Sequence, residues 1–531
     1  MSFSQTLISL VTPIDPSNQQ ERRYFSSTIN NQYIKIKPST RILICSVQKK
    51  LRMALIPHVL IFPLPLQGPV NCMLKLAELL CLHQEIHVTF LNTEHIQQRL
   101  LNCTDVQIRF EKYPNFKFVT VPDGLPEDNP RNGEQIRKLI ESVEEVSNPL
   151  LREMVTCGSL GPNSEKPITC LLIDGIFTFA VDIAKEIGIP LLYFDTISPC
   201  GLWTYLAVPK LIEAGEIPFK GNDLDALVNS VPGMEGIIRR RDLPTFCRTP
   251  DLNSPIMQHV IKEGKHIVQA QGLIFNTFEG LEGPILSQFQ ARCPNIYAIG
   301  PLHIQMKAKI SSKCLPSTTT SNSLWKEDMS CMDWLDAQPK KSVLFVSIGS
   351  LATISMAQFL EFWYGLVNSK IRFLWVQRPG SIVGLEVEDN INVPIKLSES
   401  TKERGCIVSW APQEEVLAHP SIGGFLTHSG WNSTLESIVE GVPMICWPYF
   451  VDQQVNSRYV GEVWKIGLDM KDVCDRDTIE RMVREVMEVR KIEFLERAKH
   501  MSNLAIASVS EGGSSYQDLD RLIEDIRLMR I

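Results

Sequence analysis

The sequence predicts an α/β protein built from two doubly wound domains, each with a parallel sheet covered by helices on both faces. Short apolar runs alternate with segments whose apolar residues recur at helical spacing, which is typical of parallel strand–helix–strand units. The alternation begins near Pro57, is interrupted by the polar low-complexity segment 317–323, and then begins again. Two such arrays in a chain of 531 residues favour two domains.

The first array contains four predicted strands. These short, almost wholly apolar runs span residues 58–63, 86–91, 168–173 and 190–194. A turn that contains glycine follows the first run, and residues 70–80 then have the spacing of a helix. A second helix is expected to end at Ile187, just before the last of these strands.

The second array repeats the pattern after the polar segment. Its predicted strands are 341–347, 371–376, 406–409, 423–426 and 443–446, and a helix is predicted at 356–367. We therefore assign residues 53–301 to the first domain, 302–328 to a linker and 329–531 to the second domain, whose last helix is expected to return to the first. Ligands of such sheets bind at the carboxyl ends of the strands, so two facing domains predict a cleft between them.

Residues 1–52 differ from the rest of the chain. They contain eight basic residues and two acidic ones, are rich in serine and lack apolar periodicity. This composition predicts a disordered extension. The alternatives are a transit peptide and a true start at Met53.

Composition excludes several classes of function. With 53 lysines and arginines against 60 acidic residues, the net charge of −7 argues against a nucleic-acid binder held by a bulk positive field. Neither a membrane-spanning run nor a secretory signal is recognisable in the sequence, so we expect a cytoplasmic protein with reduced cysteines. The cysteines and histidines lack metal-ligand spacing, so no metal is expected.

The segment 427–434, Thr-His-Ser-Gly-Trp-Asn-Ser-Thr, carries the first chemical signal. It lies between a predicted strand and a predicted helix, where small residues leave the helix amides free to bind an anion such as a phosphate. The alternative is an ordinary helix capped by Asn432 or Ser433. The glycine fingerprints of nicotinamide and P-loop proteins are missing from the sequence, which disfavours an oxidoreductase.

A longer segment places this signal in context. Residues Trp410 to Gln453 resemble, nearly position for position, the signature box of the plant UDP-sugar-dependent glycosyltransferases, glycosyltransferase family 1. The resemblance extends over residues 55–531 and includes Gly349-Ser350 and the motif at 511–515. It implies two facing Rossmann-like domains of the GT-B type, with the acceptor in the first domain and the UDP-sugar in the second.

The resemblance also implies roles for individual residues. It implies UDP-sugar binding by Ser350, Trp410, Ala411, Gln413, His428, Trp431, Asn432, Ser433, Glu436, Asp452 and Gln453. In the family, the indole stacks on uracil, Gln413 and Glu436 bind ribose, and the residues around His428 surround the pyrophosphate. Asp452 and Gln453 bind sugar hydroxyls, and the final glutamine favours glucose. UDP-glucose is then a co-substrate, and neither a cofactor nor a metal is implied.

The acceptor side departs from the family pattern at one position. Asp174, after a strand, matches the carboxylate that orients the catalytic base, and Thr196 matches a sugar contact. The base itself, a histidine in the family, is replaced by Pro69. Three interpretations stay open: another base such as His58, His83, His87 or His95, an acceptor that needs little base assistance, or a relative that binds UDP-sugar without transferring it.

The predicted function is inverting transfer of glucose from UDP-glucose to a hydroxyl or carboxyl of a small lipophilic plant metabolite, by a monomer. Segments 74–80 and 212–218 resemble family members that glucosylate an iridoid, so an iridoid is the expected acceptor. The alternative is a catalytically impaired UDP-sugar-binding paralogue.

Overall fold

The computed structural model describes residues 56–156, 167–312, 321–383 and 404–529. The predicted extension, residues 1–52, lies outside the described residues. Residues 313–320, which include part of the polar segment between the two arrays, also lie outside the described residues.

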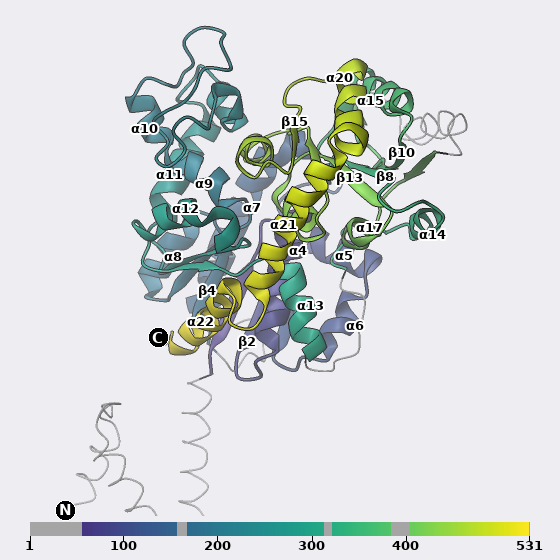
Figure 1. The fold of residues 1–531 in the computed structure, drawn as a ribbon. Coiled ribbons are helices and arrows are strands. Elements are labelled where there is room, and N and C mark those ends of the chain that lie inside the picture. The colour runs from purple at the N-terminus through teal and green to yellow at the C-terminus, as the bar shows by residue number, and fades with distance from the viewer. Residues whose placement is uncertain (1–55, 157–166, 313–320, 384–403, 530–531) are drawn as a thin grey trace, which may run out of the picture. The chain divides into compact units, whose positions relative to one another are not determined.

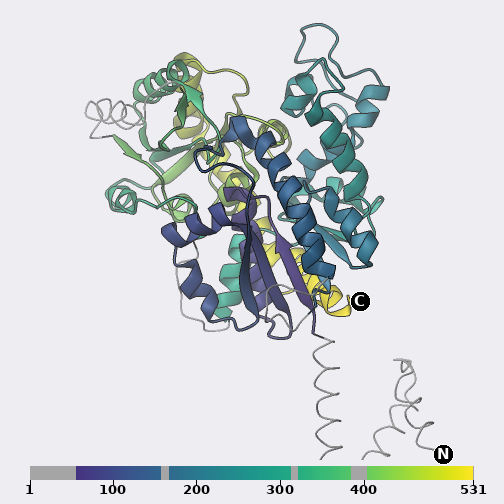
Figure 2. The ribbon, with the colours of Figure 1, turned by 180° about the vertical axis from the view of Figure 1, so that it is seen from behind.

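The first sheet has seven parallel strands. They are β1 (His58–Phe62), β2 (His87–Thr93), β3 (Phe116–Val121), β4 (Cys170–Asp174), β5 (Leu191–Asp195), β6 (Gly272–Phe275) and β7 (Ile296–Ala298). Their order is β3-β2-β1-β4-β5-β6-β7, so the direction of winding reverses between β1 and β4. Both of these central strands are fully buried, which explains their unbroken apolar sequences. In Figure 2 the purple and dark blue strands of this sheet run side by side.

The second sheet has six parallel strands and the same winding. They are β8 (Val343–Ser347), β10 (Arg372–Val376), β12 (Gly405–Val408), β13 (Ile422–Thr427), β14 (Met444–Cys446) and β15 (Gly467–Asp469). Their order is β12-β10-β8-β13-β14-β15, and the winding reverses between β8 and β13. Two doubly wound parallel sheets confirm the predicted fold class. Two further short strands, β9 (Ile354–Ser355) and β11 (Ile382–Val383), form a separate two-stranded parallel sheet.

Helices connect the strands of the first sheet. They are α4 (Gln67–Cys81), α5 (Glu94–Cys103), α6 (Val106–Glu111), α7 (Ile136–Thr156), α8 (Phe179–Ile187), α9 (Pro199–Leu206), α10 (Val208–Glu213), α11 (Pro255–Ile267) and α12 (Glu279–Gln290). The helix predicted to end at Ile187 does so because Gly188 follows it with φ +75°, a left-handed conformation that glycine adopts without strain.

The second half contributes the remaining helices. They are α13 (Leu302–Ser312), α14 (Ser330–Asp336), α15 (Met356–Ser369), α17 (Gln413–Ala418), α18 (Trp431–Val439), α19 (Gln453–Arg458), α20 (Arg476–Arg484), α21 (Lys491–Val509) and α22 (Ser514–Leu528). Residues 302–312, which we assigned to the linker, thus form a helix, and α13 packs against α4. The domain boundaries themselves stay predictions.

The last two helices, yellow in Figure 1, connect the two sheets. Helix α21 packs on α18 in the second half, where Ser502 donates a hydrogen bond to the Val439 carbonyl at 2.6 Å. Helix α22 packs on β7 of the first sheet, where Tyr297 donates to Asp525 at 2.7 Å.

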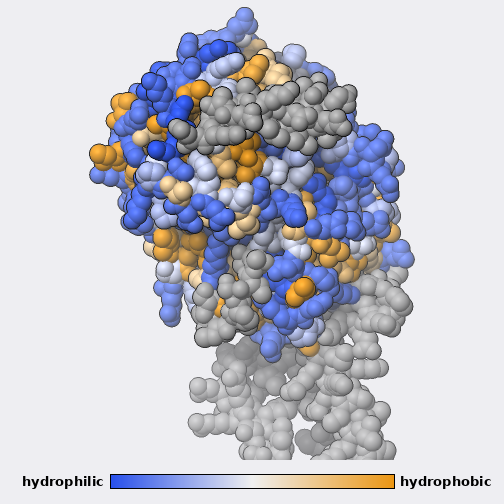
Figure 3. Space-filling model, turned by 90° about the vertical axis from the view of Figure 1, so that its right-hand side faces the viewer, coloured by the Kyte–Doolittle hydropathy of each residue, from blue (hydrophilic) through white to orange (hydrophobic). Residues whose placement is uncertain are grey.

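The surface shown in Figure 3 is mostly hydrophilic, with hydrophobic residues in smaller groups. Among the described residues, every helix is too short or too polar to cross a membrane.

Candidate active site

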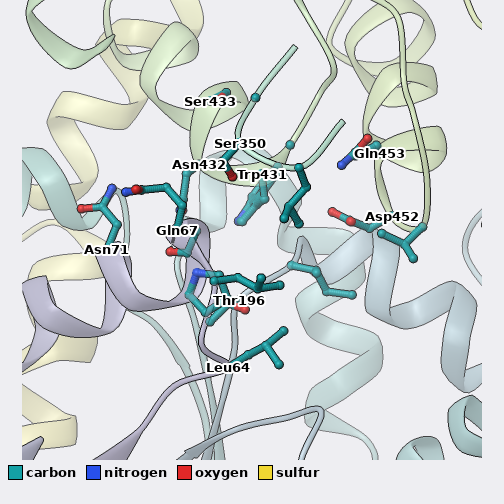
Figure 4. A pocket seen from close by; sticks show the side chains of 18 of the residues that line it. Leu64, Gln67, Asn71, Thr196, Ser350, Trp431, Asn432, Ser433, Asp452 and Gln453 are labelled. Atoms are coloured by element: carbon teal, nitrogen blue, oxygen red, sulfur yellow. Dashed lines mark hydrogen bonds between the residues drawn. The ribbon is translucent and has the colours of Figure 1, made fainter. Parts of the chain in front are cut away.

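A cavity of about 410 Å³ opens where the carboxyl ends of the two sheets meet. Segments that follow β1 and β4 line it from the first sheet, and segments that follow β8 and β13 line it from the second. These are the points at which each sheet reverses its winding, where doubly wound proteins bind ligands. Every donor-binding and acceptor-side residue that the resemblance implied lines this cavity, including Pro69, Asp174 and Thr196. Figure 4 shows several of these residues facing one another across the pocket.

The start of α18 forms the anion-binding end of the cavity. Gly430 precedes the helix, and within the described part of the chain no side chain caps it. The alternative of a helix capped by Asn432 or Ser433 is therefore wrong. The side-chain amide of Asn432 instead donates to the Gly68 carbonyl at 2.9 Å, in the turn that follows β1. The first-turn amides thus remain available for an anion.

His428 lies beside this helix start in a space that two glycines leave open. A Cβ atom at Gly349 or at Gly430 would approach the imidazole to 2.5 Å. Burial lowers the pKa of His428 to about 4, so the ring is neutral at neutral pH. Its Nδ1 atom is buried and has no hydrogen-bond partner among the described residues. A neutral imidazole can still donate one N–H to a bound oxygen.

Trp410 forms the flat wall expected for a base-stacking residue. It lines the cavity, and its indole stacks on that of Trp325 with the ring centroids 5.7 Å apart. The guanidinium of Arg99, on α5, lies 4.1 Å from the Trp325 ring centroid. The three side chains form a layered stack, which we call the Arg99–Trp325–Trp410 stack. It links a helix of the first domain to the second.

Gln413 and Glu436 form a hydrogen-bonded pair next to Trp410. The Gln413 amide donates to Glu436 at 2.6 Å and to Ser433 at 2.8 Å. Burial, together with the charge of Glu414, raises the pKa of Glu436 to about 7. Glu414 itself forms ion pairs with Lys75 of α4 and Lys307 of α13. The ion pair with Lys75 joins the two halves of the protein beside Gln413 and Glu436.

Asp452 and Gln453 begin α19 on the opposite side of the cavity. Asp452 accepts a hydrogen bond from Asn456 at 2.8 Å, and burial raises its pKa to about 6. The Gln453 oxygen accepts from the backbone amides of Tyr449 and Phe450 at 3.0 and 3.1 Å. The oxygen is thereby held, and Figure 4 shows the amide nitrogen turned toward the pocket.

Trp431 differs from the other predicted donor residues. Its side chain is 3% exposed, and the indole N–H donates to the Asn276 carbonyl at 2.8 Å. The ring also lies against Trp464. The side chain therefore packs between the two halves of the protein, and the polar group that Trp431 offers to the cavity is in its backbone.

Asp174 is held at the end of β4 on the acceptor side. Its carboxylate accepts from the Leu64 and Ile176 amides, both at 3.3 Å, and from the Thr196 hydroxyl at 3.2 Å. Burial raises the pKa of this carboxyl to about 6, although these hydrogen bonds oppose the shift. A carboxylate with such a pKa is ionised at neutral pH and can accept a proton.

The position of the family histidine lines the same cavity as Asp174. Pro69 is half-buried in the first turn of α4 and lines the cavity. None of the four histidines considered from the sequence, His58, His83, His87 and His95, is among the described residues that line it. His58 instead lies at the amino end of β1, where it contacts Thr89.

Sequence reasoning missed several ionisable residues of the cavity, and three of them lie at the end of β5 or on α11. They are Asp195, at the end of β5, and His259 and Glu263 on α11. Asp195 directly precedes Thr196, so its place at a strand end was a usable signal. The two residues on α11 are four apart on a helix that the sequence analysis did not predict. Among the described residues, no group of three or more histidine, cysteine or acidic side chains could hold a metal ion.

Comparisons with known proteins agree with this geometry. Residues 315–503 match the family model described as UDP-glucoronosyl and UDP-glucosyl transferase. The chain is 56% identical over 480 residues to 7-deoxyloganetic acid glucosyltransferase of Catharanthus roseus, covering 90% of this chain and 98% of that protein. It is 39% identical over 477 residues to 7-deoxyloganetin glucosyltransferase of Gardenia jasminoides, covering 88% and 97%.

A solved structure supports the same conclusion for the fold. Os79 from O. sativa, crystallised in complex with UDP, superposes with a TM-score of 0.72 at 27% identity, covering 88% of this chain and 100% of that one. The two facing Rossmann-like domains of the GT-B type are thereby confirmed. With 56% identity across 98% of a relative, this chain belongs to the plant UDP-dependent glycosyltransferases, glycosyltransferase family 1.

Proposed function

We propose that this protein transfers glucose from UDP-glucose, with inversion, to a small lipophilic acceptor. The observation that carries the proposal is one cavity at both winding reversals, lined by all the UDP-sugar-binding residues that the resemblance implied and by the acceptor-side residues. One cavity that is open to both sets of residues allows the two substrates to meet.

The donor is bound by the second domain. Trp410 stacks on uracil, and Trp325 packs against the other face of its indole. Glu436 binds ribose hydroxyls, and a hydrogen bond from Gln413 holds the Glu436 carboxylate in place. The pyrophosphate lies at the start of α18, where the helix dipole and the backbone amides stabilise its charge.

The sugar and the reacting bond lie between the two domains. Asp452 accepts hydrogen bonds from glucose hydroxyls, and the free Gln453 nitrogen donates one. The acceptor oxygen attacks the anomeric carbon as the bond from that carbon to the UDP oxygen breaks, and the electron pair leaves with UDP. Stabilisation of this developing phosphate charge by positioned donors is a major part of catalysis.

Asp174 receives the acceptor proton in this proposal. It lines the cavity, follows a strand end and is ionised at neutral pH. Pro69 has no group that could take the proton, so the carboxylate acts directly and not through an imidazole. General-base assistance is worth roughly 10²–10⁴ in rate, so a weaker base still leaves positioning and phosphate stabilisation.

The acceptor is an iridoid or a compound of similar size and polarity. The name of the C. roseus relative supports this class, because that protein is 56% identical to the present chain. The monomeric state, the cytoplasmic location and the absence of a metal requirement stay predictions from the sequence.

The test is turnover of UDP-glucose with a panel of acceptors that includes iridoids, phenols and carboxylic acids. We expect glucosides with inverted configuration at the anomeric carbon. Trp410→Ala and His428→Ala should each weaken UDP binding by roughly 1–3 kcal/mol, the scale of a lost stacking contact or hydrogen bond. Unchanged UDP affinity in both variants, measured by calorimetry, would remove the donor-site assignment.

Pro69 favours one second candidate, a paralogue that binds UDP-sugar without transferring it. In that case calorimetry would detect UDP-glucose binding, while no acceptor of the panel would yield a glucoside. Turnover by Pro69→His alone would then identify the missing imidazole as the cause.

A further inference from the structure

One wall of the cavity contains ionisable groups that the proposed reaction does not use. Asp195 lies at the end of β5, and His259 and Glu263 lie on α11. The two α11 residues are four positions apart and therefore share one face of the helix, the face that lines the cavity. Tyr205, on the neighbouring helix α9, lines the cavity as well. We call Asp195, His259 and Glu263 the α11 wall.

Two atoms of the α11 wall lack partners inside the protein. The Glu263 side chain is 3% exposed, and its Oε2 atom has no hydrogen-bond partner among the described residues. The Nε2 atom of His259 is also buried without one. A buried polar atom without a partner costs free energy, and a bound polar ligand would supply that partner.

Most ionisable groups around the α11 wall are acidic. Burial, and then the charge of Asp195, raises the pKa of Glu263 well above its usual range. Burial and the charge of Asp174 do the same for Asp195, which is 4% exposed. Burial also lowers the pKa of His259, and so does the charge of Lys262. Each of these shifts favours the uncharged form of the side chain.

Positive charge is scarce on the cavity surface. Among the described lining residues, Arg137 is the single arginine or lysine. It lies on α7, its side chain is 58% exposed, and it is paired with Glu141. The charge of Arg137 therefore does little to offset the negative charge of a carboxylate bound at the α11 wall.

We propose that Asp195, His259 and Glu263 bind an uncharged hydroxyl, ester or carbonyl group of the acceptor and exclude a carboxylate from this part of the cavity. This inference rests on the proposed function, since it concerns the acceptor of the same reaction. Uncharged carboxyl groups donate a hydrogen bond and the neutral imidazole accepts or donates one, so a hydroxyl can satisfy both unpartnered atoms, and an ester or carbonyl oxygen can accept from the Glu263 carboxyl. A carboxylate of the ligand would instead lie next to Asp174. Its negative charge would require the acidic groups of the α11 wall to stay protonated, and this requirement weakens the binding of the carboxylate.

The test compares two ligands that differ only in charge, methyl 4-hydroxybenzoate and 4-hydroxybenzoate. Their affinities are measured by calorimetry on the full-length protein saturated with UDP, so the measurement does not require turnover. The unsubstituted protein is expected to bind the ester at least about tenfold more tightly than the acid, because charged groups pay the larger desolvation cost. Equal affinities, or tighter binding of the acid, would overturn the proposal.

Substitutions then locate the preference. Glu263→Gln keeps the shape and the hydrogen bonding but cannot ionise, so the acid should gain affinity while the ester keeps it. Glu263→Leu should weaken ester binding about tenfold, the factor for one lost hydrogen bond. His259→Gln, at a half-buried position, should change the ester-to-acid ratio and provides a second variant if Glu263→Leu fails to fold.

The matched control is Glu279→Gln, on the exposed start of α12. It should leave both affinities unchanged, and all variants should keep the UDP affinity of the natural protein. An ester-to-acid ratio that no α11-wall variant changes would overturn the subsite. If the ratio responds as expected but no glucoside forms with any acceptor, the proposed transfer reaction fails and the binding subsite stands.

Discussion

Pro69 lies in the first turn of α4, where a proline costs the fold little. The amide that proline lacks would have no partner within the helix at this position, and the fixed φ suits a helix start. The substitution therefore removes a chemical group without disturbing the scaffold. The carboxylate of Asp174, which lines the same cavity, keeps its three hydrogen bonds.

The first prediction concerns this position. Pro69→His should raise turnover of neutral alcohol acceptors by about 10²-fold or more, because an alcohol must lose its proton as it attacks. A carboxylate acceptor has already lost its proton and should gain little. The measurement is kcat/KM for one alcohol and one acid, for the natural protein and for Pro69→His.

Asp174→Asn in both backgrounds provides the control. With histidine present, the carboxylate stabilises the imidazolium, so its loss should be costly for alcohols. If the natural protein already matches the alcohol turnover of Pro69→His, the site has another base, and His259 is the cavity histidine to substitute next.

The second prediction is a pH dependence. A base must be ionised to act, and burial raises the pKa of Asp174 to about 6. The value of kcat/KM for alcohols should therefore be constant above neutrality and fall as the pH decreases through about 6. Profiles from about pH 5 to about pH 8 for the natural protein and Asp174→Asn test this. Asp452 has a similar pKa and is present in both proteins, so an identical profile and rate would exclude Asp174 as the base.

At the scale of elements, the turn after β8 controls the shape of the phosphate site. Gly349 has φ +79°, and a Cβ atom there would lie 2.5 Å from the His428 ring. Gly380, after β10, has φ +74° but faces open space. Both glycines therefore have the left-handed backbone conformation that favours glycine. They differ in their surroundings, because an added Cβ atom would meet His428 at Gly349 and open space at Gly380.

This pair gives the third prediction. Gly349→Ala should weaken UDP binding by about 1–3 kcal/mol because it displaces His428 from the pyrophosphate. Gly380→Ala carries a similar backbone strain of about 1–2 kcal/mol without that displacement. Calorimetry and melting curves separate the two effects. Equal UDP affinity in the two variants would contradict a role of His428 in donor binding.

At the scale of the whole molecule, the residues before Met53 are expected to be dispensable. Their sequence lacks the apolar periodicity needed to join a core. The fourth prediction is that a chain starting at Met53 keeps the melting temperature and UDP affinity of the full chain. A fall of many degrees would show that the extension contributes to the folded protein.

The strands at the centre of each sheet were predictable because burial on both faces makes them continuous apolar runs, as in β1 and β4. The outer strands β7 and β15 have only three residues each, too few for any periodicity. The donor residues were predictable because one continuous segment, 410–453, carries them. Glu263 and Trp325 were not, because their roles depend on contacts with residues far away in the sequence.

The Arg99–Trp325–Trp410 stack also has an optical consequence. Two indoles with centroids 5.7 Å apart and planes 29° apart couple their electronic transitions. The far-ultraviolet circular dichroism of the protein is therefore expected to contain an exciton signal from this pair. A uracil ring that stacks on the open face of Trp410 would alter that signal, so the protein carries a label-free spectroscopic reporter of nucleotide arrival.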